Sequence, residues 1–401
     1  MSELGSLLTL EYGEALPAEA RSGYGFPVFG SNGEVGRHLN FLIPDAGIVV
    51  GRKGSVGKVT WSNSPFWPID TTYWVRCAPE DKRWLYWMLL WLPLARLDTS
   101  TGVPGLNRND VYALCVDRPR LIERQLIARV LDTLDTAIHE TEAIIAKLKA
   151  VKQGLLHDLL TRGIAANGEL RLPQAEAPHL YKESPLGWIP KEWACKPFGD
   201  LCESSAFGPR FPSDAYDENG PLATLRTTDM DEEGNITLST MPRAAIAPSV
   251  FADHLLRPGD IVISRSGTCG VTGVFAGHNI PVVPGAFLIR FRIRDVRLNR
   301  FYRRYFNSSL GRPYLERLAV GGVQKNIKGS DVLCLPVPIP SPEEAIAIAE
   351  RVESIEHDIG SNQQLFIKLT LQKSGLMDDL LTGRVRVTPL LAEAEQQKGS
   401  I

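Results

Sequence analysis

The sequence predicts an α/β (α+β) protein in which two globular domains are joined by two long antiparallel coiled-coil helices with pseudo-two-fold symmetry. The first observation is an internal repeat: residues 110–161 align without a gap onto residues 331–382, with eighteen identical positions. The second is a heptad pattern in both copies. The third is that the segments before each copy are rich in glycine, proline, aromatic and β-branched residues, which is typical of compact mixed α/β or mostly β domains.

Each copy of the repeat contains one long helix. Apolar residues alternate at spacings of four and three from Ile127 to Leu159 in the first copy and from Ile348 to Leu380 in the second. This pattern is typical of a left-handed coiled coil. A lone amphipathic helix usually packs on its own domain, but two matched seams of equal length favour pairing of the helices with each other.

The polar residues of the two seams predict a register. Thr141 and Lys152 interrupt the first seam, and Asn362 and Lys373 interrupt the second at equivalent positions. Two units related by a two-fold axis perpendicular to their helices place those helices antiparallel. One antiparallel register then brings Thr141 to Lys373 and Lys152 to Asn362, where a hydroxyl or amide meets each ammonium group. In the alternative, each lysine reaches solvent and sets no register.

The domains before the helices also resemble each other weakly. Arg52-Lys53-Gly54-Ser55-Val56-Gly57 in the first matches Arg265-Ser266-Gly267-Thr268-Cys269-Gly270 in the second. We therefore expect the duplication to cover a whole unit of domain plus helix. The expected segments are a first domain at 1–118, a first spacer helix at 119–162, a linker at 163–187, a second domain at 188–340, a second spacer helix at 341–385 and a tail at 386–401.

The composition is that of an ordinary globular protein, with 44% hydrophobic residues, 22% charged residues and a formal net charge of -2. A protein that binds nucleic acid by itself is usually basic, so the basic charge must be local or come from a partner. The most apolar run, residues 84–95, is too short to span a bilayer, and no secretory signal opens the chain. We therefore expect a cytoplasmic protein.

The sequence contains no recognisable active site. Gly51 to Val59 resembles a phosphate loop, but the spacing is one residue too long and the magnesium-binding hydroxyl is missing. Asp45, Glu80 and Lys82 match a loose nuclease pattern that arises often by chance. No adenine methyltransferase motif, Ser-His-Asp set or zinc-ligand spacing of cysteines occurs. We expect neither a catalytic residue nor a metal or cofactor in this chain.

Two groups of residues indicate nucleic-acid binding. The R-x-G-S/T-x-G turn of both domains combines arginine, backbone N–H and hydroxyl donors, which suit a DNA phosphate or base edge. The alternative is a hairpin turn that simply needs glycine. In the second domain nine arginines and two acids lie between Arg257 and Tyr305, and Arg290, Arg292 and Arg294 share one face of a predicted strand. These arginines suit phosphates or base edges, or else form a solvated face or pair with a partner's acids.

Several segments together carry a family resemblance. They are the Leu335-Pro336-Val337-Pro338-Ile339-Pro340 strand before the second long helix, the Leu-Leu-Thr end of both helices, and residues 322–327, 181–193 and 24–33. As a set they resemble the DNA-specificity (S) subunits of Type I restriction–modification systems. The first unit departs from the pattern, because it lacks the Trp-Ile-Pro-x-x-Trp arm and has Gly102-Val103-Pro104-Gly105-Leu106-Asn107 where the second has Gly-Val-Gln-Lys-Asn-Ile.

The resemblance implies two target-recognition domains that read the two halves of a bipartite, gapped site in double-stranded DNA. The paired helices would hold these domains apart and bind two methyltransferase (M) subunits, which use S-adenosylmethionine. Two restriction (R) subunits would cleave DNA with ATP and Mg²⁺. The S chain itself would be non-catalytic.

The turns, the arginine-rich segment and the resemblance together nominate a set of DNA-binding residues. They are Ser31, Asn32, Arg52, Lys53, Ser55, Lys58, Asn107, Arg108, Arg226, Arg265, Ser266, Thr268, Arg290, Arg292, Lys325 and Asn326. Two other classes of function remain open. One is a coiled-coil adaptor that joins proteins without touching DNA, and the other is a metal-dependent nuclease that uses Asp45, Glu80 and Lys82.

Overall fold

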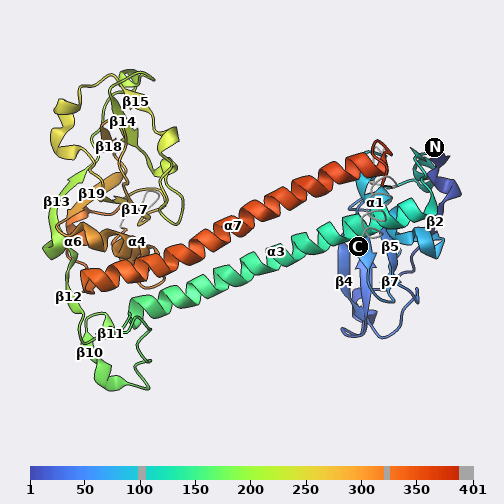
Figure 1. Ribbon diagram of the computed structural model, residues 1–401, viewed down its shortest axis with the longest axis horizontal. Coiled ribbons are helices and arrows are strands. Elements are labelled where there is room, and N and C mark those ends of the chain that lie inside the picture. The colour runs from blue at the N-terminus through green and yellow to red at the C-terminus, as the bar shows by residue number, and fades with distance from the viewer. Residues whose placement is uncertain (98–104, 320–325, 388–401) are drawn as a thin grey trace, which may run out of the picture. The chain divides into compact units, whose positions relative to one another are not determined.

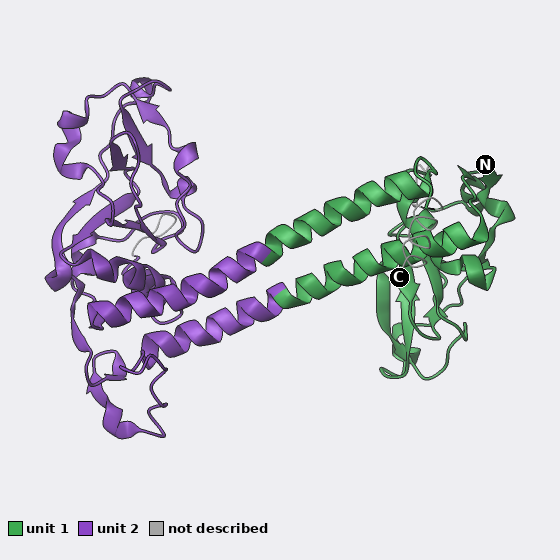
Figure 2. Ribbon diagram, in the orientation of Figure 1, with its two compact units in different colours: residues 1–144, 362–401 green, residues 145–361 purple. Residues whose placement is uncertain are grey.

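The computed structural model describes residues 1–97, 105–319 and 326–387 of the chain. It contains two compact units: unit 1 is Met1–Ile144 with Asn362–Ile401, and unit 2 is Ile145–Ser361 (Figure 2). Each unit holds one globular domain. The two long helices, α3 (Leu121–Thr161) and α7 (Pro342–Leu381), each contribute one end to each unit (Figure 1).

The domain of unit 1 contains two small sheets, and buried Val49 of the larger belongs to one cluster with Phe29 of the smaller. The larger is antiparallel, in the order β2 (Leu8–Tyr12), β8 (Thr72–Cys77), β5 (Gly47–Gly51), β6 (Val59–Ser62). The smaller is β4 (Gly33–His38), β3 (Phe26–Gly30), β7 (Trp67–Pro68), with β3 and β7 parallel. Because side chains alternate along a strand, β5 buries Ile48 and Val50 on one face and Val49 on the other, which explains its wholly apolar sequence.

The domain of unit 2 repeats this topology. Its larger sheet has the order β13 (Cys202–Phe207), β19 (Leu288–Ile293), β16 (Ile261–Ser264), β17 (Thr272–Val274). Its smaller sheet is β15 (Arg243–Ala244), β14 (Leu222–Leu225), β18 (Val282–Pro284), with β14 and β18 parallel. The strand orders match one for one, so the duplication covers the domains as well as the helices, as the sequence predicted.

Short elements complete each unit. Each unit also has one short antiparallel strand pair. In unit 1, β1 (Ser2–Glu3) pairs with β9 (Cys115–Val116), which precedes α3, and in unit 2, β12 (Ala194–Pro197) pairs with β20 (Pro336–Ile339), which precedes α7. The short helices are α1 (Lys82–Trp91), α2 (Arg108–Tyr112), α4 (Asn299–Asn307), α5 (Arg312–Leu318) and α6 (Gly329–Leu333). A hairpin of β10 (Tyr181–Ser184) and β11 (Gly187–Pro190) follows α3.

The apolar seam of each long helix enters the core of a domain. In unit 1, Ile127 and Leu131 of α3 are buried with Trp84 and Trp87 of α1. In unit 2, the equivalent residues of α7, Ile348 and Val352, are buried with Phe301 and Tyr302 of α4. Packing on the domain and pairing of the helices therefore both occur, and neither excludes the other.

Within each unit the two helices run antiparallel, as predicted, but the predicted partners are wrong. In unit 1, Nζ of Lys373 lies 2.6 Å from Oδ1 of Asp135, which precedes the predicted partner Thr141 by six residues. In unit 2, Nζ of Lys152 lies 3.3 Å from Oε1 of Glu356, six residues before Asn362. A carboxylate neutralises an ammonium group, which a hydroxyl cannot do, and the Thr141 hydroxyl instead donates to the Ala137 carbonyl.

The segment after α3, expected to be a linker, contributes to a buried ion pair. Nη1 of Arg171 lies 2.5 Å from Oε1 of Glu344 in the first turn of α7, and both side chains are less than a tenth exposed. Trp193 donates from Nε1 to the other carboxylate oxygen at 2.9 Å, and the Ile164 N–H donates to Oε1 at 2.7 Å. The Trp-Ile-Pro-x-x-Trp arm is thus fixed to the start of α7 through one carboxylate.

Candidate nucleic-acid interface

The predicted turn of unit 1 places an arginine over an exposed aromatic ring. Arg52 follows β5, and its Nη2 donates to the Asp70 carbonyl at 2.5 Å. Its guanidinium group lies 5.1 Å from the centre of the Tyr12 ring, and that of Arg108, at the start of α2, lies 5.4 Å from the same ring. Tyr12, the last residue of β2, is 51% exposed. Two cationic side chains therefore share one exposed ring.

Unit 2 has the same arrangement at the same place in its sheet. Arg265 follows β16, the counterpart of β5, and its guanidinium group lies 4.7 Å from the centre of the Phe207 ring. Phe207 ends β13, the counterpart of β2, and is 45% exposed. Nε of Arg265 donates to Oδ1 of Asn326 at 2.8 Å, which orients the guanidinium group. Tyr12 and Phe207 were not predicted as site residues, because their strands lie far along the chain from the turns.

A backbone hydrogen bond joins each turn to a residue of the other sequence motif, 102–107 in the first domain and 322–327 in the second. The Leu106 N–H donates to the Arg52 carbonyl at 2.9 Å, and the Ile327 N–H donates to the Arg265 carbonyl at 3.0 Å. Leu106 and Ile327 lie 221 residues apart, which is also the offset of the repeat. The structure thus brings together two motifs that lie more than fifty residues apart in each domain. We refer to Tyr12, Arg52 and Arg108, and to Phe207, Arg265 and Asn326, as the two arginine–aromatic sites.

The turns also need glycine for their backbone conformation, as the alternative interpretation of this motif expected. Gly54 and Gly57 have φ of 78° and 74°, and Gly267 and Gly270 have φ of 77° and 86°. Residues with a side chain rarely adopt these values, so glycine is required to form the turn. The turn therefore needs glycine for its backbone conformation and also positions an arginine side chain.

Most of the other predicted residues lie close to these turns. In unit 1, Nζ of Lys58 donates to the carbonyl and the Oδ1 of Asn32, both at 2.8 Å. Asn107 uses its side chain to cap α2 by accepting from the Asn109 N–H at 3.0 Å. Of the rest, Lys53 and Thr268 are exposed, Ser31 and Ser55 are half-buried, Ser266 is buried beside Asn326, and Lys325 lies outside the described residues.

Arg226 lies at the end of β14 and is held by a buried acid. Its Nε and Nη2 donate to the two carboxylate oxygens of Asp229 at 3.1 and 2.8 Å, and Nη2 also donates to the Thr240 carbonyl at 2.8 Å. The hydrogen bonding with the Asp229 carboxylate raises the pKa of Arg226. The group is thus held in place and remains charged.

Arg290 and Arg292 require a correction. Arg290 is 2% exposed and donates to the Ser204 hydroxyl at 3.1 Å and the Asp253 carbonyl at 3.2 Å. Burial lowers its pKa. Arg292 binds both carboxylate oxygens of buried Asp260, at 2.9 and 2.7 Å. The two arginines do share a strand face, but the chain covers it, so they support the domain from inside and do not face DNA.

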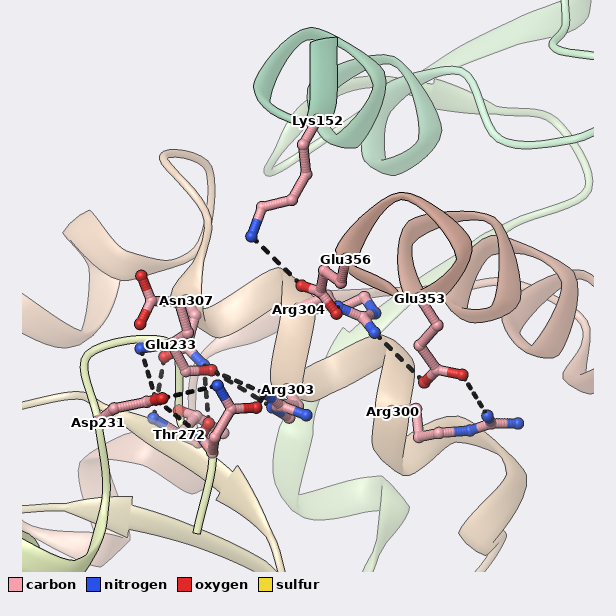
Figure 3. Close-up of polar contacts among 11 residues, drawn as sticks. Lys152, Asp231, Glu233, Thr272, Arg300, Arg303, Arg304, Asn307, Glu353 and Glu356 are labelled. Carbon is pink, nitrogen blue, oxygen red and sulfur yellow. Dashed lines mark hydrogen bonds and ion pairs between the residues drawn. The ribbon is translucent and has the colours of Figure 1, made fainter. Parts of the chain in front are cut away.

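The arginines of α4 pair with acids of this chain (Figure 3). Arg304, 6% exposed, lies 3.2 Å from Glu353 and 3.0 Å from Glu356 on α7, and Arg300 lies 2.8 Å from Glu353. Arg303 donates to the Glu233 carbonyl at 3.2 Å. These contacts fix the domain on α7 and leave the arginine–aromatic site as the better candidate for DNA.

The residues of the nuclease reading do not assemble into a metal site. Asp45 and Glu80 are exposed, and Nζ of Lys82 donates to the Ala46 carbonyl at 2.9 Å. The intervening Asp81 is buried and bound to Arg124 at 2.7 Å. Within residues 1–97, 105–319 and 326–387, no group of three or more His, Cys, Asp or Glu side chains is placed to hold a metal ion. In the same ranges no helix is long and apolar enough to cross a membrane.

Comparison with known proteins gives consistent matches. Two specificity subunits of Methanocaldococcus jannaschii, of the Type I restriction enzyme MjaVIII and the putative Type I enzyme MjaX, are 24% and 25% identical to this chain. They match 73% and 71% of this chain, and the chain spans 67% and 62% of their length.

Solved structures agree in fold. The S subunit of a Type I restriction–modification system from M. genitalium superposes with a TM-score of 0.63 at 17% identity, covering 94% of this chain and 95% of that one. A chain from a structure of Type I complex assembly gives a TM-score of 0.53 at 16% identity, covering 96% and 97%. Residues 1–150 and 190–371 match the family described as the Type I restriction modification DNA specificity domain. The chain belongs to this family.

Proposed function

We propose that this chain is the DNA-recognition subunit of a Type I restriction–modification complex and that its two domains read the two halves of a gapped DNA site. The observation that carries the proposal is the arginine–aromatic site, which occurs at the same place in two domains of the same topology. One site in each domain is what a two-part target requires.

The chemistry of the site suits base reading. An arginine can donate two hydrogen bonds to O6 and N7 of guanine in the major groove, provided that its guanidinium group is held in orientation. Asn326 and the Asp70 carbonyl supply that orientation in units 2 and 1. The backbone N–H groups of the turn suit phosphate contacts, which set the position of a domain on DNA without reading sequence.

The partners follow from the same proposal. The chain would carry no catalytic residue and no cofactor, and would act in the cytoplasm with two methyltransferase subunits that bind S-adenosylmethionine. Two restriction subunits using ATP and Mg²⁺ would complete the complex. The net charge of -2 supports a need for partner subunits in DNA binding, because contact with DNA phosphates requires an excess of positive charge that the partners would supply.

Methylation-sensitive sequencing tests the proposal. The chain is co-expressed with its methyltransferase subunit in a host without other methyltransferases, and genomic methylation is read at base resolution. We expect one gapped motif whose two halves are both required, and only weak DNA binding by the chain alone at physiological salt. An adaptor without DNA contact would leave the methylated motif unchanged when the arginine–aromatic sites are removed, and that result would reject the proposal.

A further inference from the structure

A cavity of about 490 Å³ in unit 2 adjoins its arginine–aromatic site. It lies where β13 and β14 end and where the loop between β18 and β19 begins, and Arg210, Arg226 and Phe287 line it. The Phe287 carbonyl accepts from the Arg265 N–H at 2.8 Å, and Phe207, under the Arg265 guanidinium group, is three residues before Arg210. The cavity and the candidate DNA contact therefore share the same backbone.

Aromatic rings form part of the cavity walls. Phe211, Tyr216 and Phe287 line the cavity, and Tyr216 and Phe287 are 48% and 49% exposed. The ring centres of Phe211 and Tyr216 lie 5.3 Å apart, and those of Phe211 and Phe251 lie 6.1 Å apart, so Tyr216 and Phe211 belong to a cluster of aromatic rings. Half-exposed rings held in place offer faces on which a planar ligand can stack.

The polar groups of the cavity select a neutral or anionic ligand. Arg210 and Arg226 supply guanidinium groups and Thr227 and Thr228 supply hydroxyls, while none of the described lining residues is acidic. Asp229 and Thr240 hold Nε and Nη2 of Arg226, which leaves Nη1 as a donor for a ligand. Fixed donors beside stacking surfaces match a nucleobase, whose faces are aromatic and whose edges carry acceptors.

We propose that this cavity binds a nucleobase that has left the DNA stack. The proposal rests on the DNA-recognition function proposed above. The volume of about 490 Å³ lies within the range of about 300–1,000 Å³ usual for small-ligand sites. An unpaired base next to the target would stack on Tyr216 or Phe287 while Arg265 contacts the neighbouring duplex, so the cavity would add affinity without adding sequence information.

The test compares two DNA duplexes of one sequence, one fully paired and one with a single bulged thymine. Binding of each to the full-length chain with its methyltransferase subunit is measured by fluorescence anisotropy. We expect the bulged duplex to bind about fivefold more tightly or better, which is the effect of stacking one base on an aromatic side chain. Permanganate, which oxidises unstacked thymine, should attack the bulged base in free DNA and spare it in the complex.

Variants assign the effect to the cavity. At least one of Tyr216→Ala and Phe287→Ala should lose the preference for the bulge and expose the thymine to permanganate. Trp188→Ala removes another half-exposed ring of unit 2, on the β10–β11 hairpin, and should behave like the wild type. Since both cavity residues are half-exposed, the variants are expected to fold, and a thermal melt of each verifies this.

The possible results distinguish a failure of the cavity proposal from a failure of the proposed DNA-recognition function. Equal binding of both duplexes, or a bulge preference that survives both cavity variants, overturns the cavity proposal while DNA recognition stands. Free thymidine monophosphate that binds the cavity when no bulge preference exists would assign it to a soluble nucleotide, which also overturns the proposal. If the complex binds neither duplex nor a methylated motif, the proposed function fails instead.

Discussion

Lys373 of α7 lies 2.6 Å from Asp135 of α3, and their equivalents in the repeat, Lys152 and Glu356, form the matching pair at 3.3 Å. Each residue is 221 positions from its counterpart. The lysine of one helix therefore meets the acid of the other in both units. The internal duplication has preserved an ion pair between the helices together with the residues that form it.

A second pair extends this pattern to the domains. Arg83 of α1 lies 2.7 Å from Asp132 of α3, and Arg304 of α4, which is 221 residues further on, lies 3.2 Å from Glu353 of α7. Asp132 is one helical turn from Asp135. In each unit, one helix thus presents two acids in succession. The first binds the arginine of the domain and the second binds the lysine of the other helix, and in unit 2 the second acid, Glu356, also lies 3.0 Å from Arg304.

The first prediction is that Asp135→Ala destabilises unit 1. The side chains of Lys373 and Asp135 are about a quarter exposed, at 25% and 21%, so the substitution leaves a partly desolvated ammonium group without its carboxylate. We expect the free energy of unfolding in urea to fall by about 1–3 kcal/mol. Glu142→Ala, which removes an exposed acid of the same helix, is the control. An equal effect of both variants would show that the ion pair contributes nothing.

The second prediction separates structural arginines from DNA-reading ones. Asp260→Ala removes the carboxylate that binds Arg292, and Asp260 is only 2% exposed. Because the Arg292 side chain, only 14% exposed, then loses its partner, we expect the free energy of unfolding of unit 2 to fall by about 3–5 kcal/mol. Urea denaturation followed by tryptophan fluorescence measures it. A variant of wild-type stability that has lost DNA recognition would instead return Arg292 to the DNA-binding set.

The helices could be predicted from the sequence because their signal is local. The heptad seams extend over both helices, and the repeat shows that there are two. The register failed for a physical reason. Polar residues inside the seam, such as Thr141, were matched to the lysines, whereas the true partner, Asp135, lies beside the seam. Residues that flank a seam commonly form the ion pairs between helices.

The site was predictable only in part. The turns stand out because arginine, glycine and hydroxyl residues are adjacent in sequence. The ring beneath each arginine, however, belongs to a strand two positions away in the sheet from the strand that precedes the turn. Strand alternation correctly put Arg290 and Arg292 on one face. It could not reveal that Ser204 and the Asp253 carbonyl cover that face, because they come from segments far along the chain.

The third prediction concerns pH. Burial alone would raise the pKa of Asp229, but hydrogen bonds from Arg226 and Thr240 outweigh burial and lower that pKa. A carboxyl group with a lowered pKa in the folded state stabilises the fold above its unfolded pKa of about 3.9, and this contribution is lost as the pH falls through the folded pKa. The free energy of unfolding of unit 2 should therefore drop between about pH 5 and about pH 3.

Urea denaturation at the two pH values measures this drop. Asp229→Asn removes the titrating group, so the variant should be less stable at the higher pH and should depend less on pH than the wild type. Asp214→Asn, at an exposed acid of the same domain, should keep the wild-type dependence. If Asp229→Asn also keeps it, the ion pair with Arg226 does not stabilise the domain.

The fourth prediction concerns the two arginine–aromatic sites. Arg265→Ala should weaken binding to the cognate DNA by about 1–3 kcal/mol if the guanidinium group reads a base. It should relax one half of the methylated motif and leave the other half unchanged, since the site lies within unit 2. Arg52→Ala should relax the opposite half. Methylation-sensitive sequencing with the methyltransferase subunit present reads both halves in one experiment.

Two further variants separate base reading from simple charge. Arg265→Lys keeps the charge but cannot form the paired hydrogen bonds of a guanidinium group, so it should relax the half-site nearly as much as Arg265→Ala. Arg294→Ala removes an exposed arginine of the same domain and should leave the motif intact. If lysine restored full specificity, Arg265 would be a phosphate contact and its domain would read bases elsewhere. If Arg265→Ala relaxed both halves alike, the two domains would not read the target independently.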